Sequence, residues 1–118
     1  MNYEHFTTQE FYCRCGENHE QIISERLILM LDFARHNAEV PFKISSGYRC
    51  QAWNKEVGGV LDSAHLKGLA ADIAVKDNYH RFQILNALIH IGFQRIGIYT
   101  NYIHCDIDLL QYHPTIWR

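Results

Sequence analysis

The chain is short of the features that mark several large classes of protein. It has 118 residues with 11 Lys and Arg against 13 Asp and Glu, a formal net charge of -2, and no basic cluster. This balance argues against a nucleic-acid partner and against a polybasic membrane-surface segment. Low-complexity tracts are missing, and no apolar run approaches the roughly 20 residues that span a bilayer. We therefore expect a globular protein without a membrane segment.

The start of the chain also lacks a recognisable export signal. Met1 to His5 has neither the charged nor the apolar region of a signal peptide. We expect synthesis in the cytoplasm, so that any substrate outside the cell requires another factor to deliver the protein. The length predicts a single domain, residues 1–118, with one modest core. We expect this domain to be a monomer.

Cysteine is present but sparse: the chain has Cys13, Cys15, Cys50 and Cys105. Without an export signal, free and partly buried thiols are the default expectation. A structural metal site or a redox pair at Cys13 and Cys15 needs two further ligands, and no second CxC or CxxC motif supplies them. A redox or structural-metal protein centred on this pair is therefore the least favoured hypothesis. Cys105 falls on the apolar face of a predicted strand, so we assign it to the core.

Hydrophobic periodicity predicts the secondary structure. Apolar residues at three- and four-residue spacing predict amphipathic helices over 21–36 and 79–91, after a short opening helix over 6–12. Residues 48–61 lack such a period and predict a loop with one helical turn near 52–55. The predicted strands are 42–45, 69–75, and a hairpin of 93–99 and 102–107. This mixture predicts an α+β domain, an antiparallel sheet with helices packed on one face.

Metal-competent side chains gather in two stretches. In the first, His65 and Asp72 stand seven residues apart, and in the second His104 precedes Asp106 by two. Strand alternation places Asp72 among alanines on one strand face, where a carboxylate is costly unless it is paired or metal-bound. If the two strands are neighbours, His65, Asp72 and His104 converge on a zinc ion that keeps one position open for water. The remaining histidines are expected to be surface or hydrogen-bonded residues: His5, His19, His36, His80, His90 and His113.

Several separated blocks follow one another along nearly the whole chain. They are Phe11 to Cys15, Ser45-Ser46-Gly47-Tyr48-Arg49-Cys50, Asn54, Val57-Gly58-Gly59, Ser63-x-His65-x-x-Gly68-x-Ala70-x-Asp72 and Ile103-His104-x-Asp106. Together they resemble the zinc D-alanyl-D-alanine carboxypeptidase family, especially its short phage and bacterial members. That family includes phage endolysins and vancomycin-resistance D,D-dipeptidases, and it shares its fold with the hedgehog signalling domain.

The resemblance implies a function and a set of site residues. It implies a zinc peptidase, either a D-Ala-D-Ala carboxypeptidase or an endolysin-type endopeptidase, acting on peptidoglycan stem peptides. His65, Asp72 and His104 match the zinc ligands. Arg49 matches an arginine that binds a substrate carboxylate or carbonyl, a role suited to its planar fork of donors. Ser63 matches a serine that hydrogen-bonds substrate or groups around the ligands.

One position departs from the family's pattern. Many members place an acidic general base three residues before the last histidine, where this chain has Asn101, and asparagine cannot take a proton from water. We expect Asp106 to act as the base or to orient His104. Since some relatives carry His-x-His here, Asp106 as a ligand with a catalytic His104 is a third alternative. Arg49 or His113 is expected to stabilise the oxyanion.

This departure leaves two hypotheses for the function of the protein. The favoured one is an active peptidase, acting on the cell wall after release through a holin or as part of a virion. The alternative is a zinc-containing or metal-free binding module of the same fold, because hedgehog relatives use the fold for recognition.

Overall fold

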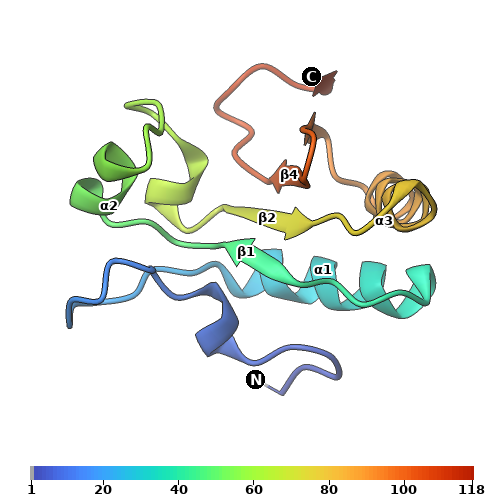
Figure 1. The fold of residues 1–118 in the computed structure, drawn as a ribbon, viewed down its shortest axis with the longest axis horizontal. Coiled ribbons are helices and arrows are strands. Elements are labelled where there is room, and N and C mark those ends of the chain that lie inside the picture. Colours follow the sequence, from blue (N-terminus) through green and yellow to red (C-terminus); the bar gives the residue numbers. More distant parts are fainter. Residues whose placement is uncertain (1) are drawn as a thin grey trace.

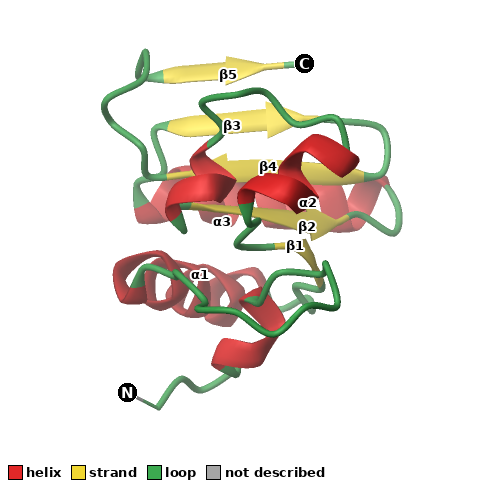
Figure 2. Ribbon diagram, turned by 90° about the vertical axis from the view of Figure 1, so that its left-hand side faces the viewer, coloured by secondary structure: helices red, strands yellow, loops and turns green. Residues whose placement is uncertain are grey.

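The computed structural model describes residues 2–118 as a five-stranded sheet with helices on both sides (Figures 1 and 2). Among these residues, no helix combines the length and the apolar character that crossing a membrane requires. The elements in chain order are η1 (Thr8–Phe11), α1 (Glu25–Ala38), β1 (Ile44–Ser46), α2 (Gln51–Glu56), η2 (Ala64–Lys67), β2 (Ala70–Ala74), α3 (Asn78–Ile91), β3 (Arg95–Ile98), β4 (Tyr102–Asp106) and β5 (Thr115–Trp117).

The sheet is mostly antiparallel, and the predicted α+β class is confirmed. The strand order is β1-β2-β4-β3-β5, and only the pairing of β3 with β5 is parallel among the described residues. The hairpin of β3 and β4 was predicted, as were β1 and β2. The edge strand β5 was not predicted, because three residues after Pro114 carry too little alternation to stand out.

The core lies on one face of the sheet. Buried side chains of α1 and α3 form a single cluster with the inward-facing residues of the strands, among them Ala71, Ile73, Ile103 and Cys105. The prediction that Cys105 belongs to the core is therefore confirmed. The predicted strand alternation is also confirmed, since Asp72, His104 and Asp106 point to the opposite face. Figure 2 shows α2 on that opposite side, in front of the sheet, with α3 behind it.

Local sequence signals explain where the helices begin and end. Ser24 Oγ accepts the backbone N–H of Leu27 and begins α1, so this helix starts later than the predicted residue 21. Asp77 caps α3 by accepting the N–H of His80 at 2.8 Å. Gly92, with a φ of 110°, ends α3 in a left-handed conformation that glycine adopts without strain. The predicted opening helix is the single turn η1.

Candidate metal centre

Three elements bring the predicted ligands together. Asp72 on β2 and His104 on β4 are direct partners across the antiparallel ladder, and His65 arrives from the η2 turn. Ser63 begins this turn, since its hydroxyl accepts the N–H of His65 at 3.2 Å. Gly68 ends it at a φ of 71°, where an added Cβ would meet the Ile22 carbonyl oxygen. The glycine therefore lets the chain turn tightly from η2 into β2.

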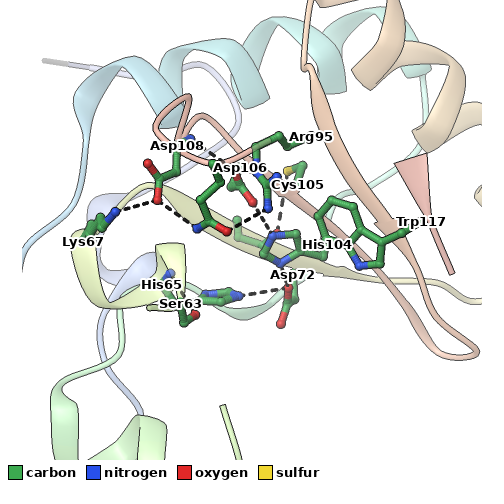
Figure 3. A network of polar contacts seen from close by, with 12 residues as sticks. Ser63, His65, Lys67, Asp72, Arg95, His104, Cys105, Asp106, Asp108 and Trp117 are labelled. Atoms are coloured by element: carbon green, nitrogen blue, oxygen red, sulfur yellow. Dashed lines mark hydrogen bonds and ion pairs between the residues drawn. The ribbon is translucent and has the colours of Figure 1, made fainter. Parts of the chain in front are cut away.

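Figure 3 shows the three side chains around one carboxylate oxygen. Asp72 Oδ1 lies 3.2 Å from His65 Nε2 and 2.9 Å from His104 Nδ1. One donor atom from each residue lies within 4.8 Å of the other two. His65 and Asp72 are buried, and His104 is half-buried. The site thus offers two imidazole nitrogens and one carboxylate oxygen, the donor set of a catalytic zinc with an open position.

Hydrogen-bond partners on the side away from Asp72 fix the tautomers of both imidazoles. His65 Nδ1 lies 2.7 Å from the carbonyl oxygen of Gly47, which can only accept, so Nδ1 carries the hydrogen. His104 Nε2 lies 2.7 Å from Asp106 Oδ2 and donates to it. Neutral imidazoles with these tautomers turn unprotonated nitrogens towards Asp72. Three acceptors that face one another need protons or a cation between them, so a divalent ion fits this site.

The pKa shifts of Asp72 and His104 agree with a cation at this site. Burial raises the pKa of Asp72, but its close contacts with the imidazoles of His104 and His65 outweigh burial and hold the pKa well below its usual range. Burial lowers the pKa of His104, while its close contacts with the carboxylates of Asp106 and Asp72 outweigh burial and raise the pKa. The site therefore favours an ionised carboxylate and a positive charge beside it.

Arg49 reaches the same carboxylate from the other side. Its Nη2 donates to Asp72 Oδ2 at 3.3 Å, while Nε and Nη1 donate to Ser46 and Asn54. The guanidinium therefore holds the Asp72 oxygen that the imidazoles leave free. Arg49 also lines the cavity above the site.

Asp106 is at the wall of the cavity but is almost fully enclosed by its neighbours. Only 1% of its surface is exposed. Its Oδ1 accepts Arg95 Nε at 2.8 Å and the Asp108 backbone N–H at 3.0 Å, while Oδ2 faces His104. Asp106 is not part of the group of donor atoms formed by His65, Asp72 and His104. Both of its oxygens are thus engaged on the outer side of His104.

A polar cavity of about 370 Å³ opens over the three ligands. Sequence patterns missed part of its wall, which includes Arg95, Tyr99, Gln111 and Trp117. Arg95 could have been predicted as a site residue, because it pairs with Asp106 across the β3–β4 hairpin. Trp117 could not, because it reaches the site from the unpredicted strand β5.

The structure places His113 and the cysteine pair differently from what the sequence suggested. His113 is exposed, its Nδ1 contacts the Gln111 carbonyl, and it does not line the cavity, so the structure does not support the expected oxyanion role. A metal site at Cys13 and Cys15 was the least favoured hypothesis because no second cysteine motif supplies two further ligands. His19 and Cys50 join them in one cluster, because the fold, rather than a local motif, brings the four side chains together.

The fold and the donor set define a candidate metallohydrolase. The model of the Peptidase M15 family matches residues 4–106, and the chain belongs to this family of zinc-dependent peptidases. The match contains His65, Asp72, His104 and Arg49, and it ends before Gln111 and Trp117. No match is found among curated proteins.

Proposed function

We propose that this protein is a zinc peptidase that hydrolyses peptide bonds in peptidoglycan stem peptides. The observation that carries the proposal is the convergence of His65, Asp72 and His104, with the tautomers of both imidazoles set by outer partners, at the floor of a cavity. Zinc held there would acidify water and polarise the scissile carbonyl. Membership of a family of zinc peptidases that act on peptidoglycan supports the substrate class.

Arg49 is proposed to serve the ligand and the substrate together. Three of its five N–H donors are directed at Ser46, Asn54 and Asp72. The contact with Asp72 fixes the orientation of that ligand. The remaining donors face a substrate carbonyl or carboxylate in the cavity, where a guanidinium stabilises developing negative charge.

Asp106 is proposed as the residue that orients His104, rather than as the base. A base must reach the proton of the attacking water, directly or through one further water. Asp106 is buried, and its oxygens already accept from His104, Arg95 and the Asp108 N–H. A carboxylate behind a ligating histidine fixes the ring and raises its basicity as a ligand. The arrangement thus supports one of the alternatives that the sequence left open.

Aromatic residues give the cavity a surface for a peptide. Tyr99 and Tyr102 stack with ring centroids 4.6 Å apart, and Trp117 completes the wall. Burial, followed by the charge of Asp72, raises the pKa of Tyr102, so its phenol stays protonated at neutral pH. We propose that this phenol donates a hydrogen bond to the bound peptide. Both a carboxypeptidase and an endopeptidase are compatible with this wall.

Mass spectrometry of products identifies both the activity and the bond that is cut. Purified protein is incubated with sacculi and with synthetic stem peptides ending in D-Ala-D-Ala. Release of D-Ala indicates a carboxypeptidase, and internal cleavage indicates an endopeptidase. His65→Ala should abolish either product, while His90→Ala, on the exposed side of α3, should match the wild type. Absence of any product from zinc-loaded wild-type protein would refute the peptidase proposal.

A second candidate function is a zinc-containing module that binds cell-wall peptides without cutting them. The observation in its favour is that Asp72 and Asp106 are the only carboxylates lining the cavity within residues 2–118, and both are engaged. Binding of stem peptides by wild-type protein, with no product after prolonged incubation, would support this function over the first.

A further inference from the structure

A second cluster of metal-competent side chains lies outside the cavity described above. We define the Cys/His cluster as Cys13, Cys15, His19 and Cys50. One donor atom from each residue lies within 4.8 Å of the other three. The four residues come from the loop after η1, from the segment before α1 and from the residue that begins α2. All three cysteines are half-buried free thiols.

We propose that the Cys/His cluster binds a structural zinc ion through three thiolates and one imidazole. Four sulfur and nitrogen donors close a tetrahedral site and leave no position for water, which is the pattern of structural rather than catalytic zinc. Ligand bonds of that kind place neighbouring donor atoms about 3.5–3.8 Å apart. Cys15 Sγ and His19 Nε2 lie 3.1 Å apart, and the other donor pairs lie within 4.8 Å. An ion therefore fits after shifts of roughly 1 Å or less.

Backbone N–H groups are directed at the sulfurs of the Cys/His cluster. Cys13 Sγ accepts the N–H of Cys50 at 3.3 Å, Cys15 Sγ accepts that of Glu17 at 3.3 Å, and Cys50 Sγ accepts that of Trp53 at 3.4 Å. Each of the three sulfurs thus receives a backbone donor. Such donors can hydrogen-bond the sulfur of a metal-bound cysteine, whose metal-binding form is the thiolate.

His19 is also oriented for metal binding. His19 Nδ1 lies 2.7 Å from the carbonyl oxygen of Glu20, and a carbonyl can only accept, so Nδ1 carries the hydrogen. The other nitrogen, Nε2, then turns its lone pair towards Cys15 Sγ. A hydrogen bond from the outer nitrogen to a backbone carbonyl is a recurrent arrangement for histidines that bind zinc.

The position of the Cys/His cluster indicates what the proposed ion would stabilise. Cys50 directly follows Arg49, and the same loop carries Gly47, whose carbonyl holds His65. The Tyr48 N–H donates to the Phe11 carbonyl at 2.8 Å, so this loop already lies against the N-terminal segment. An ion between Cys13, Cys15 and Cys50 would fasten the two segments together. The structural zinc would therefore support the loop that positions Arg49.

Metal counting on the full chain tests the proposal. Protein purified under reducing conditions, with zinc supplied and excess removed, should contain about two zinc ions per chain. His65→Ala should keep about one, held by the cluster, and Cys15→Ser should also keep about one, held by His65, Asp72 and His104. Cys105→Ala, a cysteine change in the core, is the matched control and should retain both. Cysteine variants with the wild-type zinc content would overturn the proposal.

Two measurements on soluble protein remain decisive if a cysteine variant fails to fold. A mercurial reagent should release one equivalent of zinc from the His65→Ala chain, because it displaces metal only from thiolates. Cobalt bound to that chain should show sulfur-to-metal charge-transfer absorption. Zinc release without mercurial dependence, or cobalt without that band, would contradict the proposed zinc site. None of these outcomes depends on peptidase activity.

Discussion

At the residue scale, the Asp72 carboxylate uses both of its oxygens to hold the metal centre together. Asp72 Oδ1 faces the two histidines, and Oδ2 accepts from Arg49. His104 in turn transmits the orientation set by Asp106, which Arg95 holds at 2.8 Å. The contacts from Arg95 through Asp106 thus orient the half-buried ligand His104. Substitutions of Asp106 and of Arg49 distinguish a residue that positions a ligand from one that contacts the substrate.

Asp106→Asn should weaken zinc affinity about 10–100-fold, because the residue that orients His104 loses its charge. Activity at saturating zinc should recover much of the wild-type rate. Affinity is measured by competition with a chromogenic chelator, and the exposed Asp62→Asn is the control. Unchanged zinc affinity together with a rate loss of about 10²–10⁴ would instead identify Asp106 as the base.

Arg49→Lys should lower kcat/KM about 10–100-fold, because a lysine cannot reproduce charge-assisted hydrogen bonds from three nitrogens at once. Zinc content should stay at the wild-type value, since the three ligands remain. Steady-state kinetics on the cleaved stem peptide and metal analysis give the two readouts. Arg26→Lys, on the exposed side of α1, should leave both unchanged. Wild-type kcat/KM for Arg49→Lys would exclude a role in substrate binding.

At the scale of elements, the edge of the sheet completes the cavity. β5 runs parallel to β3 and places Gly97 opposite Trp117. The indole lies with its ring 5.5 Å from His104 and 5.0 Å from the Arg95 guanidinium. A Cβ on Gly97 would meet Trp117 Nε1 at 2.6 Å. The missing side chain at Gly97 is thus what lets the indole lie over the sheet.

Gly97→Ala should displace Trp117 and cost about 1–3 kcal/mol of stability through overpacking. The double variant Gly97→Ala/Trp117→Phe should recover part of that loss, because the smaller ring leaves room for the methyl group. Urea unfolding of the two single variants and the double variant gives the coupling energy. Strict additivity would show that the alanine and the indole do not compete for the same space.

Elements with a clear period could be predicted from sequence, whereas contacts that depend on tertiary structure could not. Alternation in β2 and β4 was enough to predict that Asp72 and His104 face one side of the sheet. β5 was missed because three residues cannot establish a period. His19 and Cys50 were missed because the Cys/His cluster takes residues from three segments, and Cys50 lies 37 positions from Cys13. The family's pattern reaches neither β5 nor Gln111.

At the scale of the whole molecule, the segment after β4 is tied back to the η2 turn that carries His65. Lys67 Nζ lies 2.8 Å from Asp108 Oδ2 (Figure 3), and Ile107 N donates to the Leu69 carbonyl. Asp108 is 1% exposed. Burial raises the pKa of Asp108, but hydrogen bonds from Lys67 and Gln111 outweigh it and lower the pKa. The folded protein therefore favours the ionised carboxylate.

Acidification should remove the stability that Asp108 contributes. Because its folded pKa lies below the unfolded value of about 3.9, the contribution is fully present above that value. It is lost as the pH falls through the folded pKa. The free energy of unfolding should therefore fall more steeply in acid for the wild type than for Asp108→Asn, measured in urea at constant zinc. The exposed Asp62→Asn should follow the wild type, and parallel curves for Asp108→Asn would contradict the expectation.

We propose that zinc held by His65, Asp72 and His104 enables cleavage of peptidoglycan. The most direct measurement is a zinc add-back titration of chelator-treated protein, with cleavage of sacculi followed by mass spectrometry. Activity should disappear with the metal and return in proportion to the zinc restored, while His104→Ala stays inactive throughout. Full activity in metal-free protein, or wild-type activity from His104→Ala, would contradict the claim.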